Sequence, residues 1–72
     1  MPYQSIEDLP PSVRHALPVH AQEIYRAAFN DAWTRYAGIG DEGIAHRVAW
    51  AAVKRAYEKR GGAWAPRLLH SG

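Results

Sequence analysis

The chain has 72 residues, a formal net charge of +2 and no cysteine. A chain of this length forms one domain that buries only about 60% of the surface its unfolded form exposes, so its stability is marginal. Without cysteine there is neither a disulfide nor a thiolate metal site, and the composition suits the reducing cytoplasm. The longest apolar run, Val48 to Val53, is far shorter than the roughly 18 residues that cross a bilayer, so we expect a soluble protein.

Charge is unevenly distributed along the chain. Residues 1–41 carry three basic and five acidic side chains, whereas residues 42–72 carry six basic and two acidic ones. The molecule is therefore predicted to be dipolar, with its positive end in the C-terminal half.

Prolines divide the first part of the chain. Leu9-Pro10-Pro11 predicts an extended turn, because a residue that precedes a proline is pushed out of the helical region. Pro11 suits the first position of a short helix near residues 11–17. Leu17 ends this helix because Pro18 follows, and Pro18 can begin the next one.

The clearest amphipathic pattern predicts a long second helix over about residues 18–36. Its apolar residues follow the three-four spacing of a helix without interruption, and they are Ala21, Ile24, Tyr25, Ala28, Phe29, Ala32, Trp33 and Tyr36.

A third helix is predicted over about residues 42–60, and its apolar arc is wide enough to need cover from more than one side. Cations in its last turn followed by Gly61-Gly62 are typical of a helix end. The two long helices are expected to share a core in which six residues are mutually buried: Phe29, Trp33, Val48, Ala49, Ala52 and Val53.

Between the long helices, Ala37 to Gly43 contains the Gly-x-Gly-x-x-Gly spacing of dinucleotide-binding sites. That motif should follow a strand, but here it follows a helix, and Asp41 and Glu42 would repel a phosphate. We interpret the glycines as a helix stop, with Asp41 as the cap of the next helix.

The two ends of the chain are expected to lie close together. Residues 2–6 alternate apolar and polar side chains, as a strand does, but they are too few for more than a short edge strand. The candidate partner of this strand is the tail around Trp64. The domain is expected to span residues 1–66, with residues 67–72 as a frayed tail, because a terminus is disordered unless it is tied down. The prediction is thus an all-α fold, a small irregular array of one short and two long helices with at most a minor N-/C-terminal strand pair.

No pattern of catalytic or metal-ligating residues is found, so we expect neither an enzyme nor a metal or other cofactor. The four histidines lack the i, i+4 spacing of a helical zinc site, and the carboxylates are too few to enclose calcium. His46 lies within the apolar arc of the third helix, where a single histidine is most often a hydrogen-bonded core residue.

Basic residues near the third helix form the only surface that suggests a function. Cations interleaved with Trp50, Tyr57 and Trp64 resemble a single-strand nucleic-acid groove, in which charges bind phosphates and rings stack on bases. The simpler interpretation is a solvated helix end that complements its own dipole, with the rings in the core. The candidate partner-binding residues are Arg47, Lys54, Arg55, Lys59 and Arg60.

The sequence resembles the ChaB family of cation transport regulators over nearly its whole length. The resemblance is carried by Met1-Pro2-Tyr3, Asp8-Leu9-Pro10, Leu17-Pro18-x-His20-Ala21-Gln22-x-Ile24-Tyr25, Ala28-Phe29-Asn30-x-Ala32-Trp33-x-x-Tyr36 and Ala45-His46-x-Val48-Ala49-Trp50-Ala51-Ala52-Val53-Lys54-x-x-Tyr57. The typical member has a longer and strongly charged linker between the long helices, where this chain has the short Ala37 to Gly43.

This resemblance implies a compact helical domain that modulates a ChaA-type sodium (calcium)/proton antiporter. We therefore expect a non-enzymatic, cytoplasmic interaction domain that docks on the transporter through a charged helix surface. Members that resemble this family also occur in DNA viruses and fused to Rho N-terminal-like modules, so nucleic-acid binding by the same basic end is the alternative.

Overall fold

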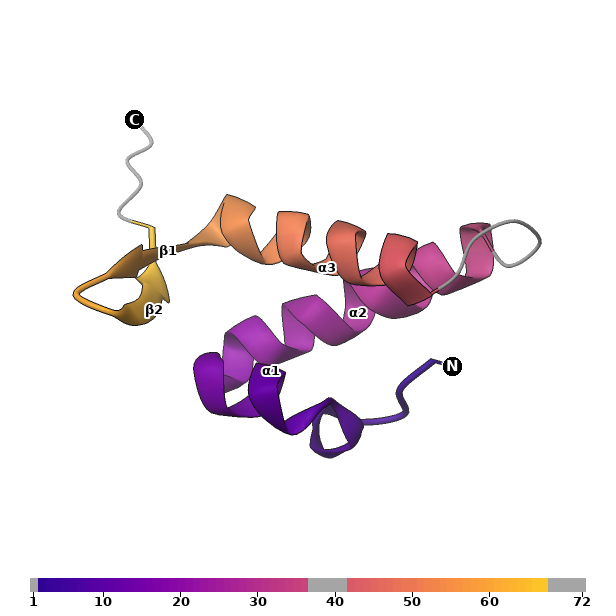
Figure 1. Cartoon of the computed structure of the whole chain (residues 1–72), viewed down its shortest axis with the longest axis horizontal. Helices are drawn as coiled ribbons and strands as arrows, with labels where there is room; N and C mark the ends of the chain where they lie inside the picture. The colour runs from indigo at the N-terminus through magenta and orange to yellow at the C-terminus, as the bar shows by residue number, and fades with distance from the viewer. Residues whose placement is uncertain (1, 37–41, 68–72) are drawn as a thin grey trace.

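The computed structural model of the chain describes residues 2–36 and 42–67. Helices occupy most of this length, and a β-hairpin follows the last helix (Figure 1). In chain order the elements are the short 3-10 helix η1 (Ile6–Asp8), α1 (Pro11–Ala16), α2 (Val19–Arg35), α3 (Glu42–Ala56), β1 (Tyr57–Arg60) and β2 (Ala63–Pro66). The predicted fold class, one short and two long helices with a minor strand pair, is confirmed.

Prolines set the boundaries of the first helices as predicted. Pro11 occupies the first turn of α1, and Leu17 closes this helix in an extended conformation with φ −114° and ψ 140°. Pro18 then stands at the N-cap of α2, and its carbonyl accepts a hydrogen bond from the backbone N–H of Gln22 at 2.9 Å. Steric restriction before proline therefore separates α1 from α2 without a longer loop.

Helix α3 runs back along α2, and these two helices make the largest contact in the domain (Figure 1). The side chains of Tyr25, Phe29 and Val53 are fully buried between them. Segments η1 and α1 pack against α2. The remaining members of the buried core are Leu9, Val13, Leu17, Ala21, Ala32, Ala45, Ala49 and Tyr57.

The predicted core is confirmed at its centre and wrong at its edge. Phe29, Ala49 and Val53 are fully buried, and Trp33 and Ala52 are half-buried, but Val48 is 36% exposed. Val48 lies roughly a quarter turn of helix away from Ala49. Because η1 and α1 pack mainly on α2, the wide apolar arc of α3 is not covered all round, and Val48 stays exposed.

The prediction of a helix reaching residue 60 is wrong, because α3 ends at Ala56 and residues 57–60 form a strand. Strands β1 and β2 pair antiparallel through a two-residue turn, Gly61-Gly62, whose φ values are 58° and 85°. Positive φ at both central residues is the requirement of the type I′ hairpin turn, which glycine meets without steric cost. The two glycines thus form a hairpin turn.

The minor strand pair includes the tail around Trp64 as predicted, but its partner is β1 rather than residues 2–6. The N-terminal segment is instead held by the side chains of Asn30 and Arg26 of α2. The Asn30 amide accepts a hydrogen bond from the backbone N–H of Tyr3 and donates one to its carbonyl, both at 2.8 Å. The Tyr3 ring also lies 4.7 Å from the Phe29 ring, centroid to centroid.

Two predictions fall partly or wholly on residues outside the described ranges. Residues 37–41 of the predicted linker, with the cap at Asp41, and most of the tail expected to fray, 68–72, lie outside these ranges. The last two linker residues, Glu42 and Gly43, belong to α3. Arg67 is described, and its backbone N–H donates to the carbonyl of Ala56 at 2.9 Å, so the hairpin ladder extends to this residue.

Removing the Phe29 ring is expected to destabilise the domain by about 3 to 5 kcal/mol, because Phe29→Ala leaves a cavity at the centre of the core. The free energy of unfolding, measured in urea, checks this value. Val19→Ala is the control, since Val19 is 60% exposed and its truncation should change stability by well under about 1 kcal/mol. Equal urea midpoints for Phe29→Ala and the parent would show that the core is assigned wrongly.

Candidate docking surface

The hairpin sorts its charged residues onto two faces, because successive side chains of a strand point to opposite sides. Glu58 and Arg60 lie on one face of β1, whereas Tyr57 and Lys59 lie on the other. Tyr57 is buried in the core, so its face is turned toward the helices. The face that carries Glu58 is turned away from the core.

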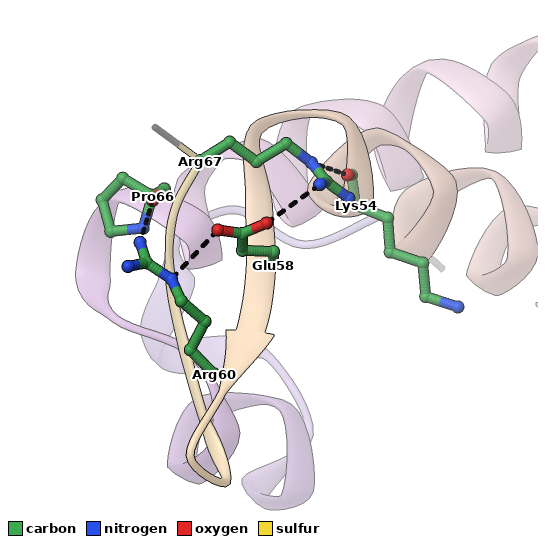
Figure 2. A network of polar contacts seen from close by, with 5 residues as sticks. All are labelled: Lys54, Glu58, Arg60, Pro66 and Arg67. Atoms are coloured by element: carbon green, nitrogen blue, oxygen red, sulfur yellow. Dashed lines mark hydrogen bonds and ion pairs between the residues drawn. The ribbon is translucent and has the colours of Figure 1, made fainter. Parts of the chain in front are cut away.

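Glu58 lies at the centre of a polar network on this outer face (Figure 2). Its carboxylate forms ion pairs with Arg60 Nε at 3.0 Å and with Arg67 Nη1 at 3.2 Å. Arg60 Nη2 also donates to the carbonyl of Pro66 at 2.8 Å. One carboxylate therefore neutralises part of the charge of two arginines, and Arg60 is held within the hairpin.

Arg67 fastens the end of the hairpin to α3. Its Nε donates to the carbonyl of Lys54 at 2.8 Å, which satisfies one of the carbonyls that a helix leaves unpaired in its last turn (Figure 2). Arg67 is not among the predicted partner-binding residues, because it falls in the tail that the sequence predicts to fray. Reading Gly61-Gly62 as a two-residue hairpin turn would have placed Arg67 opposite Ala56, beside the end of α3.

The exposed side chain of Lys59 also makes a contact within the domain. Its ammonium nitrogen lies 5.8 Å from the centroid of the Trp64 ring, in a cation–π arrangement. Trp64 in turn packs against Trp50 of α3, with ring centroids 5.7 Å apart, and both rings are half-buried. With Tyr57 buried, the three rings interleaved with cations in the sequence take part in packing, as the simpler interpretation expected.

The other three candidate residues lie on the outer face of α3. Arg47, Lys54 and Arg55 are exposed, and Arg47 and Lys54 are seven residues apart, which places them on one line along a helix. None of these three side chains takes part in an ion pair within residues 2–36 and 42–67. The structure therefore separates the five predicted residues into three on the helix and two on the hairpin.

His46 is hydrogen-bonded, as predicted, and is half-buried at the edge of the core. Its Nδ1 is hydrogen-bonded to the hydroxyl of Tyr25, and its ring lies 5.1 Å from the ring of Phe29, centroid to centroid. Burial raises the pKa of Tyr25 to about 12, with a smaller contribution from the neighbouring Tyr3. Tyr25 thus keeps its hydroxyl proton at neutral pH.

A second tyrosine–histidine pair connects α2 to the hairpin, since His20 Nδ1 lies 3.1 Å from the hydroxyl of Tyr57. In the part of the chain that the structure describes, no group of three or more histidine or acidic side chains is placed to hold a metal ion. The same part has no helix long and apolar enough to cross a membrane.

These features define a small helical domain with a hairpin whose charges are largely paired and a helix face whose cations are exposed. The family model for ChaB matches residues 9–67. Relatives from Escherichia coli K12 and Shigella flexneri, both named "Putative cation transport regulator ChaB", are 53% identical over 82% of this chain and 87% of their own length.

A solution NMR structure of a protein with the same name is also similar to this chain. It is 47% identical, has a TM-score of 0.81, and the match covers 92% of this chain and 99% of that one. The chain belongs to the ChaB family.

The raised pKa of Tyr25 predicts a loss of stability in alkaline solution. Below pH 10, Tyr25 is protonated in both the folded and the unfolded state; between pH 10 and about 12 only the unfolded state ionises, so stability falls as pH rises. The loss should be on the order of 1 kcal/mol by pH 11. Urea unfolding at pH 9 and pH 11 measures it.

Tyr25→Phe should show a smaller alkaline loss than the parent, whereas the control Tyr36→Phe, at an exposed tyrosine, should behave like the parent. The same pH dependence in the parent and in Tyr25→Phe would contradict this assignment.

Glu58→Gln is expected to destabilise the domain by about 1 kcal/mol or less, because the ion pairs that it removes are solvent-exposed. Thermal melts at low and high salt measure the effect, which should shrink at high salt as screening weakens the parent's ion pairs. Glu23→Gln is the control, since it makes the same charge change at an exposed site on α2. If both variants melt alike, the network around Glu58 does not stabilise the hairpin.

Proposed function

We propose that this protein regulates a cation/proton antiporter of the ChaA type by docking on its cytoplasmic face as a non-enzymatic interaction domain. The proposal is supported by membership of a family whose similar relatives are named as cation transport regulators. The observation that carries the docking mechanism is a set of exposed cations on the outer face of α3, Arg47, Lys54 and Arg55, which form no ion pair with the residues that the structure describes.

Lys59 and Arg60, the other two predicted residues, lie on the hairpin and not on this face of α3. Their side chains are partly held by Trp64 and Glu58, so they offer less charge to a partner than the exposed side chains of α3 do. Regulation then follows from differential binding: the domain shifts the transporter toward whichever conformation presents the more complementary acidic surface. This mechanism requires neither a catalytic residue nor a bound cation.

Ion flux in proteoliposomes that contain a ChaA-type antiporter tests the proposal. Adding the parent domain should change the rate of sodium/proton exchange. The surface variant, Lys54→Gln/Arg55→Gln, should lose at least half of that change. The control variant, Arg14→Gln/Arg35→Gln, lowers the net charge by the same amount at exposed sites on α1 and α2, and it should retain the effect.

An unchanged exchange rate in the presence of the parent domain would refute antiporter regulation. Micromolar, salt-sensitive binding of the parent to single-stranded DNA at physiological ionic strength would instead favour the nucleic-acid alternative, because each phosphate contact releases counterions.

A further inference from the structure

The outer face of α3 carries only positive charge. On a helix of 3.6 residues per turn, Arg47, Ala51 and Lys54 share one line, and Val48 and Arg55 lie beside it. Arg47 and Lys54 are separated by roughly 10 Å along the helix axis. The acidic residue of this helix, Glu42, lies in its first turn. The cations therefore form a strip without an interspersed carboxylate.

The polar network on the hairpin leaves this strip available. The Glu58 carboxylate is occupied by Arg60 and Arg67, so it does not pair with the side chain of Lys54. Figure 2 shows the Lys54 ammonium group pointing away from this network, although the backbone carbonyl of Lys54 belongs to it. Lys54 thus supports the hairpin through its backbone and keeps its charge for a partner.

The apolar side chains on the same face add little to its cations. Val48 is 36% exposed, and Ala51 is small. Single-stranded nucleic acid needs exposed rings, but Trp50 and Trp64 pack on one another. A surface with many dispersed anionic groups can bind this face through its positive charges alone.

We infer that the outer face of α3 binds the anionic phospholipid headgroups of a membrane surface through Arg47, Lys54 and Arg55. This inference rests on the proposed function for its biological setting, since an antiporter is embedded in such a surface. Each Lys or Arg close to an anionic leaflet strengthens the attraction about five-fold, so three cations bind weakly and reversibly. Weak binding raises the concentration of the domain beside the transporter, and the same cations can then exchange phospholipid headgroups for an acidic surface of the transporter.

Vesicle co-sedimentation without any transporter tests this inference separately from the flux experiment. The probes are vesicles of phosphatidylglycerol and phosphatidylcholine in equal parts, and vesicles of phosphatidylcholine alone. The parent should bind the first and not the second, and binding should vanish in 1 M salt, where charges are screened beyond about 3 Å.

The surface variant Lys54→Gln/Arg55→Gln should bind the anionic vesicles roughly thirty-fold more weakly, since it removes two cations from the strip. The control variant Arg14→Gln/Arg35→Gln should stay within about three-fold of the parent, because its changes lie on other helices. Circular dichroism melts of both variants establish that each is folded.

Three results would overturn the inference: no binding of the parent to anionic vesicles at low salt, equal weakening in both variants, or equal binding to both kinds of vesicle. Equal weakening would mean that net charge, rather than this face, governs the attraction. None of these results would refute antiporter regulation, which depends on the flux measurement. Conversely, an unchanged flux would leave the vesicle result standing.

Discussion

Hydrogen bonds from the side chains of α2 hold the other segments of this domain in place. Asn30 binds the backbone of the N-terminal segment, Tyr25 is hydrogen-bonded to His46 of α3, and His20 to Tyr57 of β1. Gln22 donates to the carbonyls of Arg14 and Leu17 at the end of α1. In so short a chain the apolar core is small, so directional contacts decide how short segments such as α1 and the hairpin are oriented.

Several residues that make these contacts also carry the sequence resemblance to the family. Five residues both belong to the sequence pattern that resembles the family and make a contact between segments of the fold. They are His20, Gln22, Tyr25, Asn30 and His46. The pattern therefore describes a scaffold in large part, whereas most of the exposed cations lie outside it. The folded core and the proposed docking surface use almost separate sets of side chains, so surface substitutions can be tested without unfolding the domain.

The helices could be predicted from the sequence because their signals are local: the three-four spacing of α2 and the prolines on both sides of α1. The hairpin could not be predicted in this way, because Gly61-Gly62 after Lys59 and Arg60 also fits the end of a helix. Only the pairing of residues 57–60 with residues 63–66 distinguishes a hairpin turn from a helix end. The exposure of Val48 depends on which segments cover α3, which is a tertiary property. The basic residues of the candidate surface were recognisable by type, but their division between helix and hairpin, and the role of Arg67, follow from the strand register.

Because α3 ends at Ala56, its cations differ in their distance from the end of the helix. Lys54 and Arg55 lie in the last turn, where cations are stabilised by the helix dipole whether or not a partner exists. That effect falls off within one turn, so it does not stabilise Arg47, which lies two turns earlier on the same line. A cation far from the helix end, aligned with Lys54 and without a carboxylate beside it, fits an external anion better than internal stabilisation. Arg47 is therefore the residue that separates a docking strip from an ordinary helix terminus.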